Sequence, residues 1–226
     1  MKKSSVFILF FLFQYFFTQQ CGCAQNSELK EVISCKPQIF KNNAKIYWQY
    51  NCNSSWLTFQ NKNIKKKIFS LDKDLIGLTT RLGYSNIKEY KNSFLAEYLV
   101  ISGCCEPPEY ILHNKTNAEI IGKLGSFLYQ GKTKDHIPFI LTLKSYTSIL
   151  FTDLNTNKIS TYHIKEGLLE KIMVQNNFLT TDDIFEEIQM KNNIILLKYK
   201  ILNNKTRGFE KKSIKINIQN FYNHSI

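Results

Sequence analysis

The chain has 226 residues, 43% of them hydrophobic, and a formal net charge of +12 from 30 basic and 18 acidic residues. This length is enough for one domain with a substantial core. Apart from Arg81 and Arg207, every basic residue is lysine, which lacks the planar fork that holds phosphate at two points. The composition therefore argues against nucleic acid. It does not identify a partner, and leaves an anionic lipid or polysaccharide surface, or another envelope protein, as candidates.

The N-terminus has the organisation of an export signal. Two lysines precede the apolar run Val6–Phe17, and the small residues Gly22 and Ala24 follow. This order predicts a signal peptide over residues 1–24 and a single domain over residues 25–226. The run is shorter than the roughly 20 residues that cross a bilayer. We expect an exported protein, periplasmic or secreted, with no transmembrane span after signal removal.

A lipid anchor is the alternative to a free exported protein. Bacterial lipoproteins are cut just before a cysteine that then becomes acylated. Cys23 follows Gly22, which suits this signal, but Gln20 stands where a leucine-like residue is usual. Cys21 is preceded by two glutamines and fits less well. Lipidation at Cys23 therefore stays open as the alternative.

Signals for secondary structure begin with one helix and continue as strands. Residues 27–33 predict a short helix capped by Ser27, since a serine oxygen can accept the free N–H groups of a first turn. Three later runs are rich in aromatic and β-branched residues, which favour strands. These runs cover residues 46–50, 98–101 and 139–143.

The C-terminal third alternates apolar and polar residues, most clearly over 214–219. A polar turn at 191–193 predicts that residues 184–190 fold back on 194–202 as a hairpin. Residues 181–183 favour a short helical turn just before it. The sequence thus predicts a mainly β fold, a single antiparallel domain of hairpins with at most one or two short helices.

A weak internal repeat bears on the architecture. The segments YILHNKTNAEI, ILFTDLNTNKI and KILNNKTRGFE each place a polar turn after an apolar run. The matching turn positions are His113, Asp153 and Asn203, and a residue that tolerates positive φ is expected to close each turn. Hairpins of this kind favour a β-sandwich or an open barrel, with a β-propeller-like array as the alternative.

Four cysteines remain after a cut at Ala24, namely Cys35, Cys52, Cys104 and Cys105. An even count in an exported chain predicts disulfides. A bond between the two adjacent cysteines would strain the peptide between them. We therefore expect Cys104 and Cys105 to bond to Cys35 and Cys52, in either order. Zinc knuckles need a Cys-x2-4-Cys spacing that these four cysteines lack, so no metal site is predicted.

No motif in the sequence points to a particular reaction, and no cofactor is predicted. The leading hypothesis is a non-catalytic binding or envelope-associated protein. The alternative is an envelope hydrolase whose site is dispersed along the chain. It requires at least three candidate side chains to converge in one pocket. These candidates are Asp135, His136, Asp153, His163 and Glu166.

Overall fold

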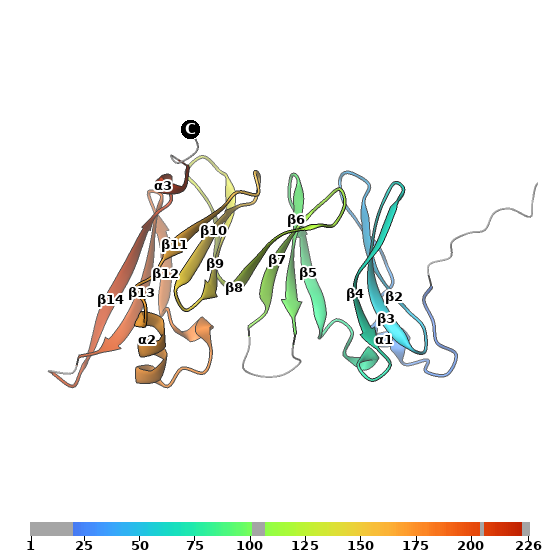
Figure 1. Ribbon diagram of the computed structural model, residues 1–226, viewed down its shortest axis with the longest axis horizontal. Coiled ribbons are helices and arrows are strands. Elements are labelled where there is room, and N and C mark those ends of the chain that lie inside the picture. The colour runs from blue at the N-terminus through green and yellow to red at the C-terminus, as the bar shows by residue number, and fades with distance from the viewer. Residues whose placement is uncertain (1–19, 101–106, 204–205, 223–226) are drawn as a thin grey trace, which may run out of the picture.

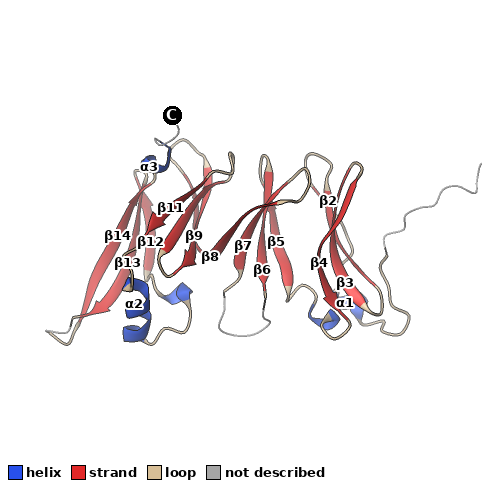
Figure 2. Ribbon diagram, in the orientation of Figure 1, coloured by secondary structure: helices blue, strands red, loops and turns tan. Residues whose placement is uncertain are grey.

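The computed structural model describes residues 20–100, 107–203 and 206–222. The protein is mainly β, as predicted, and its sheets are antiparallel (Figure 2). The described residues include three short α-helices, one more than expected. They are α1 (Leu29–Val32), α2 (Leu168–Asn176) and α3 (Gln219–Tyr222).

The described strands form three sheets. The first has the order β1-β2-β3-β4, the second runs from β11 to β5, and the third has the order β12-β13-β14. The first sheet consists of β1 (Gln38–Ile39), β2 (Lys45–Tyr50), β3 (Ser54–Asn61) and β4 (Ile64–Asp72). The second consists of β5 (Gly83–Glu89), β6 (Ser93–Leu99), β7 (Glu109–Asn114), β8 (Ile120–Lys132), β9 (Pro138–Ser145), β10 (Ser148–Asp153) and β11 (Ile159–His163). The third consists of β12 (Glu187–Lys191), β13 (Ile194–Leu202) and β14 (Phe209–Asn217).

The seven-stranded sheet folds over at β8, which belongs to two layers. Residues 120–126 pair with β7 and residues 126–132 pair with β9. Between the two halves, Gly125 has a φ of +87°, a backbone state that glycine adopts readily. The fold-over creates four stacked layers, which follow one another along the molecule in Figure 1. Layer 1 is β1–β4, layer 2 is β5–β7 with residues 120–125, layer 3 is residues 126–132 with β9–β11, and layer 4 is β12–β14.

This stacking explains why the middle strands lack a period of two in sequence. In β6, Phe94 and Ala96 belong to the core between layers 1 and 2, whereas Leu95 belongs to the core between layers 2 and 3. A strand buried on both faces is apolar at successive positions. In β14, by contrast, Ile214 and Ile216 are buried while Lys215 is exposed, so the alternation is visible.

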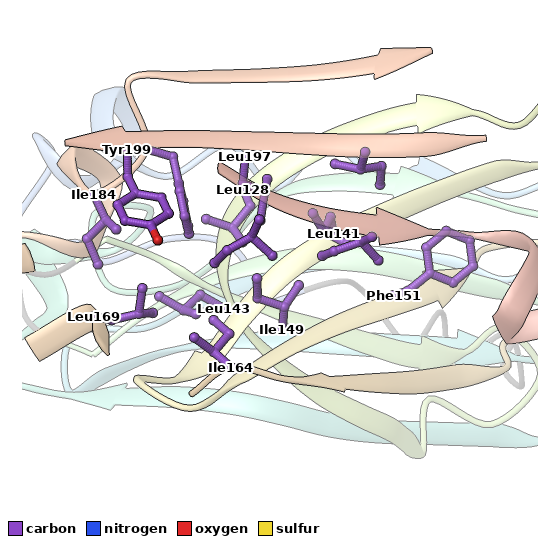
Figure 3. Close-up of a cluster of buried hydrophobic side chains, with 14 of the residues drawn as sticks. Leu128, Leu141, Leu143, Ile149, Phe151, Ile164, Leu169, Ile184, Leu197 and Tyr199 are labelled. Atoms are coloured by element: carbon purple, nitrogen blue, oxygen red, sulfur yellow. The ribbon is translucent and has the colours of Figure 1, made fainter. Parts of the chain in front are cut away.

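Three hydrophobic clusters hold the four layers together. The N-terminal core, between layers 1 and 2, contains Phe40, Phe59 and Phe94. The middle core joins Leu112 of β7 to Ile140 of β9. The C-terminal core, between layer 3 and layer 4 with α2, is mostly aliphatic (Figure 3).

Several local predictions are confirmed. β12 and β13 form the expected hairpin, with Lys191 opposite Ile194. A 3-10 turn over Thr181–Asp183 precedes it. Helix α1 forms where a short helix was predicted, but Ser27 is not its side-chain cap. Glu28 occupies the N-cap position and makes no side-chain capping bond.

The repeated turn exists, but its register was misjudged by one residue in the first copy. The equivalent positions are Asn114, Asp153 and Asn203, not His113. In each, the backbone N–H donates to the carbonyl five residues later, and the residue four places later donates back. That later residue has positive φ, as expected. These residues are Ala118 (φ 57°), Asn157 (φ 66°) and Arg207 (φ 52°).

The expected disulfide pairing is wrong. Cys35 is bonded to Cys21, and Cys52 is bonded to Cys23. Both partners lie in the segment that was assigned to the signal peptide, which is why they were left out of the count. Since each sulfur joins only one other sulfur, neither Cys35 nor Cys52 can bond to Cys104 or Cys105. The latter two lie outside the described residues.

Among the described residues, none of the helices combines the length and apolar character that a bilayer span requires. Residues 1–19, which carry most of the predicted signal, lie outside the described part of the chain.

Candidate functional site

The five hydrolase candidates are spread over both ends of the layers. Asp135 and His136 are exposed in the turn between β8 and β9. Asp153 is buried, and its Oδ1 accepts the backbone N–H groups of Asn155 (2.8 Å) and Thr156 (3.0 Å). This carboxylate is therefore engaged in holding the turn between β10 and β11.

The other two candidates lie at the opposite end of layer 3. His163 is paired with Ser148, at the start of β10, whereas Asp153 ends that strand. Five residue steps along a strand separate the two ends by about 17 Å. Glu166 is exposed in the segment that follows β11. The structure therefore separates His163 and Glu166 from the other three candidates, and the dispersed hydrolase site stays an untested alternative.

Metal chemistry has no obvious location in the described part of the chain. No group of three histidine, cysteine, aspartate or glutamate side chains there is placed to hold an ion.

A polar groove of about 850 Å³ lies where turns of layers 1, 2 and 3 meet, at the upper edge of Figure 1. We call it the turn groove. Residues from the β1–β2, β5–β6, β7–β8 and β10–β11 turns form its walls. They are Lys41, Asn42, Glu89, Tyr90, Lys91, Asn92, Asn114, Lys115, Thr116 and Asn155.

The floor of the turn groove is an ion pair with little access to solvent. Lys115 Nζ lies 2.8 Å from Glu89 Oε1 and donates a second hydrogen bond to Tyr90 O (2.9 Å). The Lys41 backbone N–H also donates to Glu89 Oε1 (2.8 Å). Desolvation by itself raises the pKa of Glu89, but the hydrogen bonds from Lys115 and Lys41 outweigh it, so the pKa of Glu89 is lowered. Glu89 is therefore ionised at neutral pH.

Asparagine side chains tie the walls of the groove to one another. Asn42 Nδ2 donates to Lys115 O (3.1 Å), which links layer 1 to layer 2. Asn61 Nδ2 donates to Thr116 O (2.9 Å) across the same boundary. Asn92 Nδ2 lies 3.4 Å from Asn155 O and links layer 2 to layer 3. These bonds fix the shape of the groove before any ligand arrives, which lowers the entropy lost on binding.

The chemistry of the groove is cationic and hydrogen-bonding. Its lining contains three lysines and one glutamate, a net charge of +2. Because Lys115 and Glu89 neutralise each other, the excess charge belongs to Lys41 and Lys91, which are exposed at the rim. Lysine ammonium groups, amides and a threonine hydroxyl suit a ligand that carries hydroxyl and carboxylate or sulfate groups.

A second hollow, of about 490 Å³, is lined mainly by apolar side chains, in contrast to the polar lining of the turn groove. It lies beside α2 at the opposite end of the layers (Figure 1). Val174 is 77% exposed and Leu179 81% exposed in its lining, and the charged residue there is Glu170. The remaining lining residues are Tyr146, Met173, Asn177 and Phe178. We call it the apolar hollow.

No protein-family model matches the chain, and no curated protein matches its sequence. The site therefore rests on geometry alone. Sequence reasoning missed Glu89 and Lys115 because they lie 26 residues apart and meet only when two hairpin turns pack together. The NKT turn at 114–116 was noticed, but as a turn and not as the source of a buried cation.

Proposed function

We propose that this protein is exported and acts as a non-catalytic binding protein that holds an anionic polysaccharide in the turn groove. The observation that carries the proposal is a prearranged polar groove whose excess positive charge lies at its rim. Hydroxyl groups of a sugar chain pair with the amides and Thr116, and its carboxylates or sulfates pair with Lys41 and Lys91. The Glu89–Lys115 pair keeps the floor rigid and electrically neutral.

A polysaccharide suits this groove better than an anionic lipid surface. Peripheral lipid binding combines cations with exposed apolar side chains that enter the bilayer. The exposed aliphatic residues Val174 and Leu179 belong to the apolar hollow at the far end, beside Glu170. These two side chains therefore lie at the opposite end of the layers from Lys41 and Lys91, so they cannot meet one flat membrane together with the cationic rim.

Two features support export. The N-terminal sequence has the order of a signal peptide, and the described chain contains two disulfides. Disulfides form and persist mainly in oxidising compartments such as the periplasm or the cell exterior.

The binding test is calorimetric titration of the purified protein with alginate, an anionic polyuronate, at 50 and 150 mM salt. We expect binding that weakens at the higher salt, because exposed charges are screened. Neutral dextran and phosphatidylglycerol vesicles serve as comparisons and should bind more weakly. Vesicle binding without alginate binding would replace this proposal by a lipid-surface role.

Two matched double variants locate the site. Lys41→Gln with Lys91→Gln removes the rim charges and should weaken alginate binding about fivefold, since two exposed charge contacts contribute about 1 kcal/mol together. Lys65→Gln with Lys67→Gln removes the same charge from the densest lysine run of the chain. It should change the affinity less than twofold. Equal losses in both variants would show diffuse charge attraction and contradict a site in the turn groove.

A further inference from the structure

The segment Gln20–Ala24 is part of the folded domain. The Tyr50 N–H donates to Gln20 O (3.1 Å), and the Gly22 N–H donates to Tyr50 O (3.3 Å). Cys21 thereby forms a parallel bridge with Tyr50, on the edge of β2 that pairs with β1 further along. The bridge satisfies both backbone groups of a residue that is 3% exposed.

Two disulfides attach the same segment covalently. Cys21 is bonded to Cys35, 14 residues away, with the Cα atoms 6.4 Å apart. Cys23 is bonded to Cys52, 29 residues away, with the Cα atoms 4.8 Å apart. Both separations lie in the usual range for a disulfide. The N-terminal segment is thus bonded to the connection between α1 and β1, through Cys35, and to the turn between β2 and β3, through Cys52.

A cut after Ala24 is incompatible with these bonds. It would remove Cys21 and Cys23, deprive Cys35 and Cys52 of their partners, and leave the buried Tyr50 amide and carbonyl without the bridge. Acylation of Cys23 is incompatible as well, because the thioether to a diacylglyceryl group would use the sulfur that bonds to Cys52. The predicted cleavage point and the lipid-anchor alternative therefore conflict with the same two bonds.

We propose that export processing cuts the chain between Thr18 and Cys21, so that the mature protein keeps both cysteines as disulfides and carries no lipid on either. This inference rests on the export half of the proposed function. A cut there falls directly after the apolar run that ends at Phe17, but it lacks the small residues of a usual cleavage site, so the two disulfides carry this inference. The step is hydrolysis of one peptide bond by one water molecule.

The disulfides form after processing, in a separate oxidation step. Each pair of thiols gives up two protons and two electrons to an oxidising protein disulfide, which is reduced to a dithiol. The result places the new N-terminus within three residues of a covalent staple. An end that would otherwise fray is thereby held against β2.

The experiment is expression of the full chain in a bacterium with a periplasm, followed by recovery of the exported form. Intact mass and N-terminal sequencing should give a first residue of Gln19, Gln20 or Cys21. A tryptic map without reductant should link the peptide that ends at Lys30 to the peptides that contain Cys35 and Cys52. A first residue of Gln25, or a diacylglyceryl mass on Cys23, would overturn the inference.

A variant separates the two candidate cleavage points. Ala24→Gln places a large residue where a peptidase that cuts after Ala24 needs a small one, and Ala24 is exposed in the structure. We expect export and the first residue to be unchanged in this variant. Loss of processing would show that the cut follows Ala24. Retention of the unprocessed chain in the cytoplasm, for both versions, would instead contradict export itself and with it this part of the proposed function.

Discussion

The two outer cores of this protein solve the same packing problem with different side chains. Between layers 1 and 2, aromatic rings contact one another in a network that includes Phe40, Phe59, Phe94 and Tyr84. Between layers 3 and 4, branched aliphatic residues such as Leu141, Ile195 and Leu197 fill most of the space (Figure 3). Each core joins two antiparallel layers, so the difference lies in composition and not in architecture.

The two cores also differ in what closes them. The N-terminal core is reinforced by the two disulfides and by α1, whose Leu29 is buried in it. The described part of the C-terminal core has no disulfide and is covered by α2 through Leu169 and Ile172. The two outer cores are therefore covered in different ways, the N-terminal one by two disulfides with the short helix α1 and the C-terminal one by the longer amphipathic helix α2.

The sharpest test of the aromatic core is Phe94, which stacks on Phe59 and His113 and contacts Phe40. Phe94→Ala should lower the free energy of unfolding by about 3–5 kcal/mol, because it removes a fully buried ring and leaves a cavity. Urea denaturation followed by fluorescence measures this. The control is Ile120→Ala, at a site that is 50% exposed, with an expected loss below about 1 kcal/mol. Equal losses would show that the rings do not hold these layers together.

Reduction of the disulfides tests the difference in closure. Loops of 14 and 29 residues each contribute about 3–4 kcal/mol in the chain-entropy account. The Cys23→Ser and Cys52→Ser double variant should therefore lose about 3–4 kcal/mol. Hydrogen exchange should accelerate in β2 and β3 before β13 and β14. Uniform acceleration over all four layers would mean that the two ends do not open separately.

How far the sequence predicts these two regions depends on solvent exposure. The hairpin of β12 and β13 was predicted because one face of the outer layer meets water and imposes a period of two. Strands β6, β7, β9 and β10 of layers 2 and 3 have runs of residues buried on both faces, so their apolar runs indicate strands but not which core each residue enters. The fold-over at Gly125 has no sequence signal beyond the glycine itself.

Helix α2 was not predicted although its boundaries are marked. Gly167 (φ 70°) precedes it and Asn177 (φ 54°) ends it, both in the left-handed region. Between them, Leu169 and Ile172 lie on its buried face. A helix of nine residues shows this spacing for only about two and a half turns, which is too short for a clear period of 3.6.

The site residues were beyond sequence reasoning for a different reason. Glu89 and Lys115 belong to separate hairpin turns, and their contact depends on how layer 2 is assembled. The disulfide error had a single cause: a boundary placed after Ala24 removed Cys21 and Cys23 from the count. A boundary before Cys21 would have left six cysteines and admitted the observed pairs among many others.

The fold-over between the two halves of the molecule is tested at Gly125. A Cβ built there would lie 2.1 Å from Leu143 O, and its φ of +87° is strained for any other residue. Gly125→Ala should cost about 1–3 kcal/mol for the backbone alone and more for the clash. The matched control is Gly77→Ala, where a Cβ meets nothing within 4 Å. Thermal unfolding of both variants gives the comparison, and equal melting temperatures would contradict a constrained bend.

The smallest expected effect is a pH dependence of the free energy of unfolding that arises in the N-terminal core. Layers 1 and 2 bury a histidine among their aromatic rings. His113 is 1% exposed, stacks on Phe94 and donates from Nδ1 to Ala118 O (3.2 Å). Burial lowers the pKa of His113, the bond to Ala118 opposes this, and the charge of Lys66 lowers the pKa further. Its Nε2 has no hydrogen-bond partner among the described residues.

The sign of the pH effect follows from this lowered pKa. The unfolded chain takes up a proton near pH 6.5, whereas the folded protein does so only at a lower pH, so acid favours unfolding. The contribution of neutral His113 is complete above about pH 6.5 and declines below it, by at most about 1.4 kcal/mol per pH unit. Urea midpoints measured between pH 7.5 and 5 give the slope. His113→Phe keeps a ring against Phe94 but cannot titrate, so its slope should be smaller by that amount. An identical slope in both proteins would assign the acid sensitivity to other groups and remove this difference between the two cores.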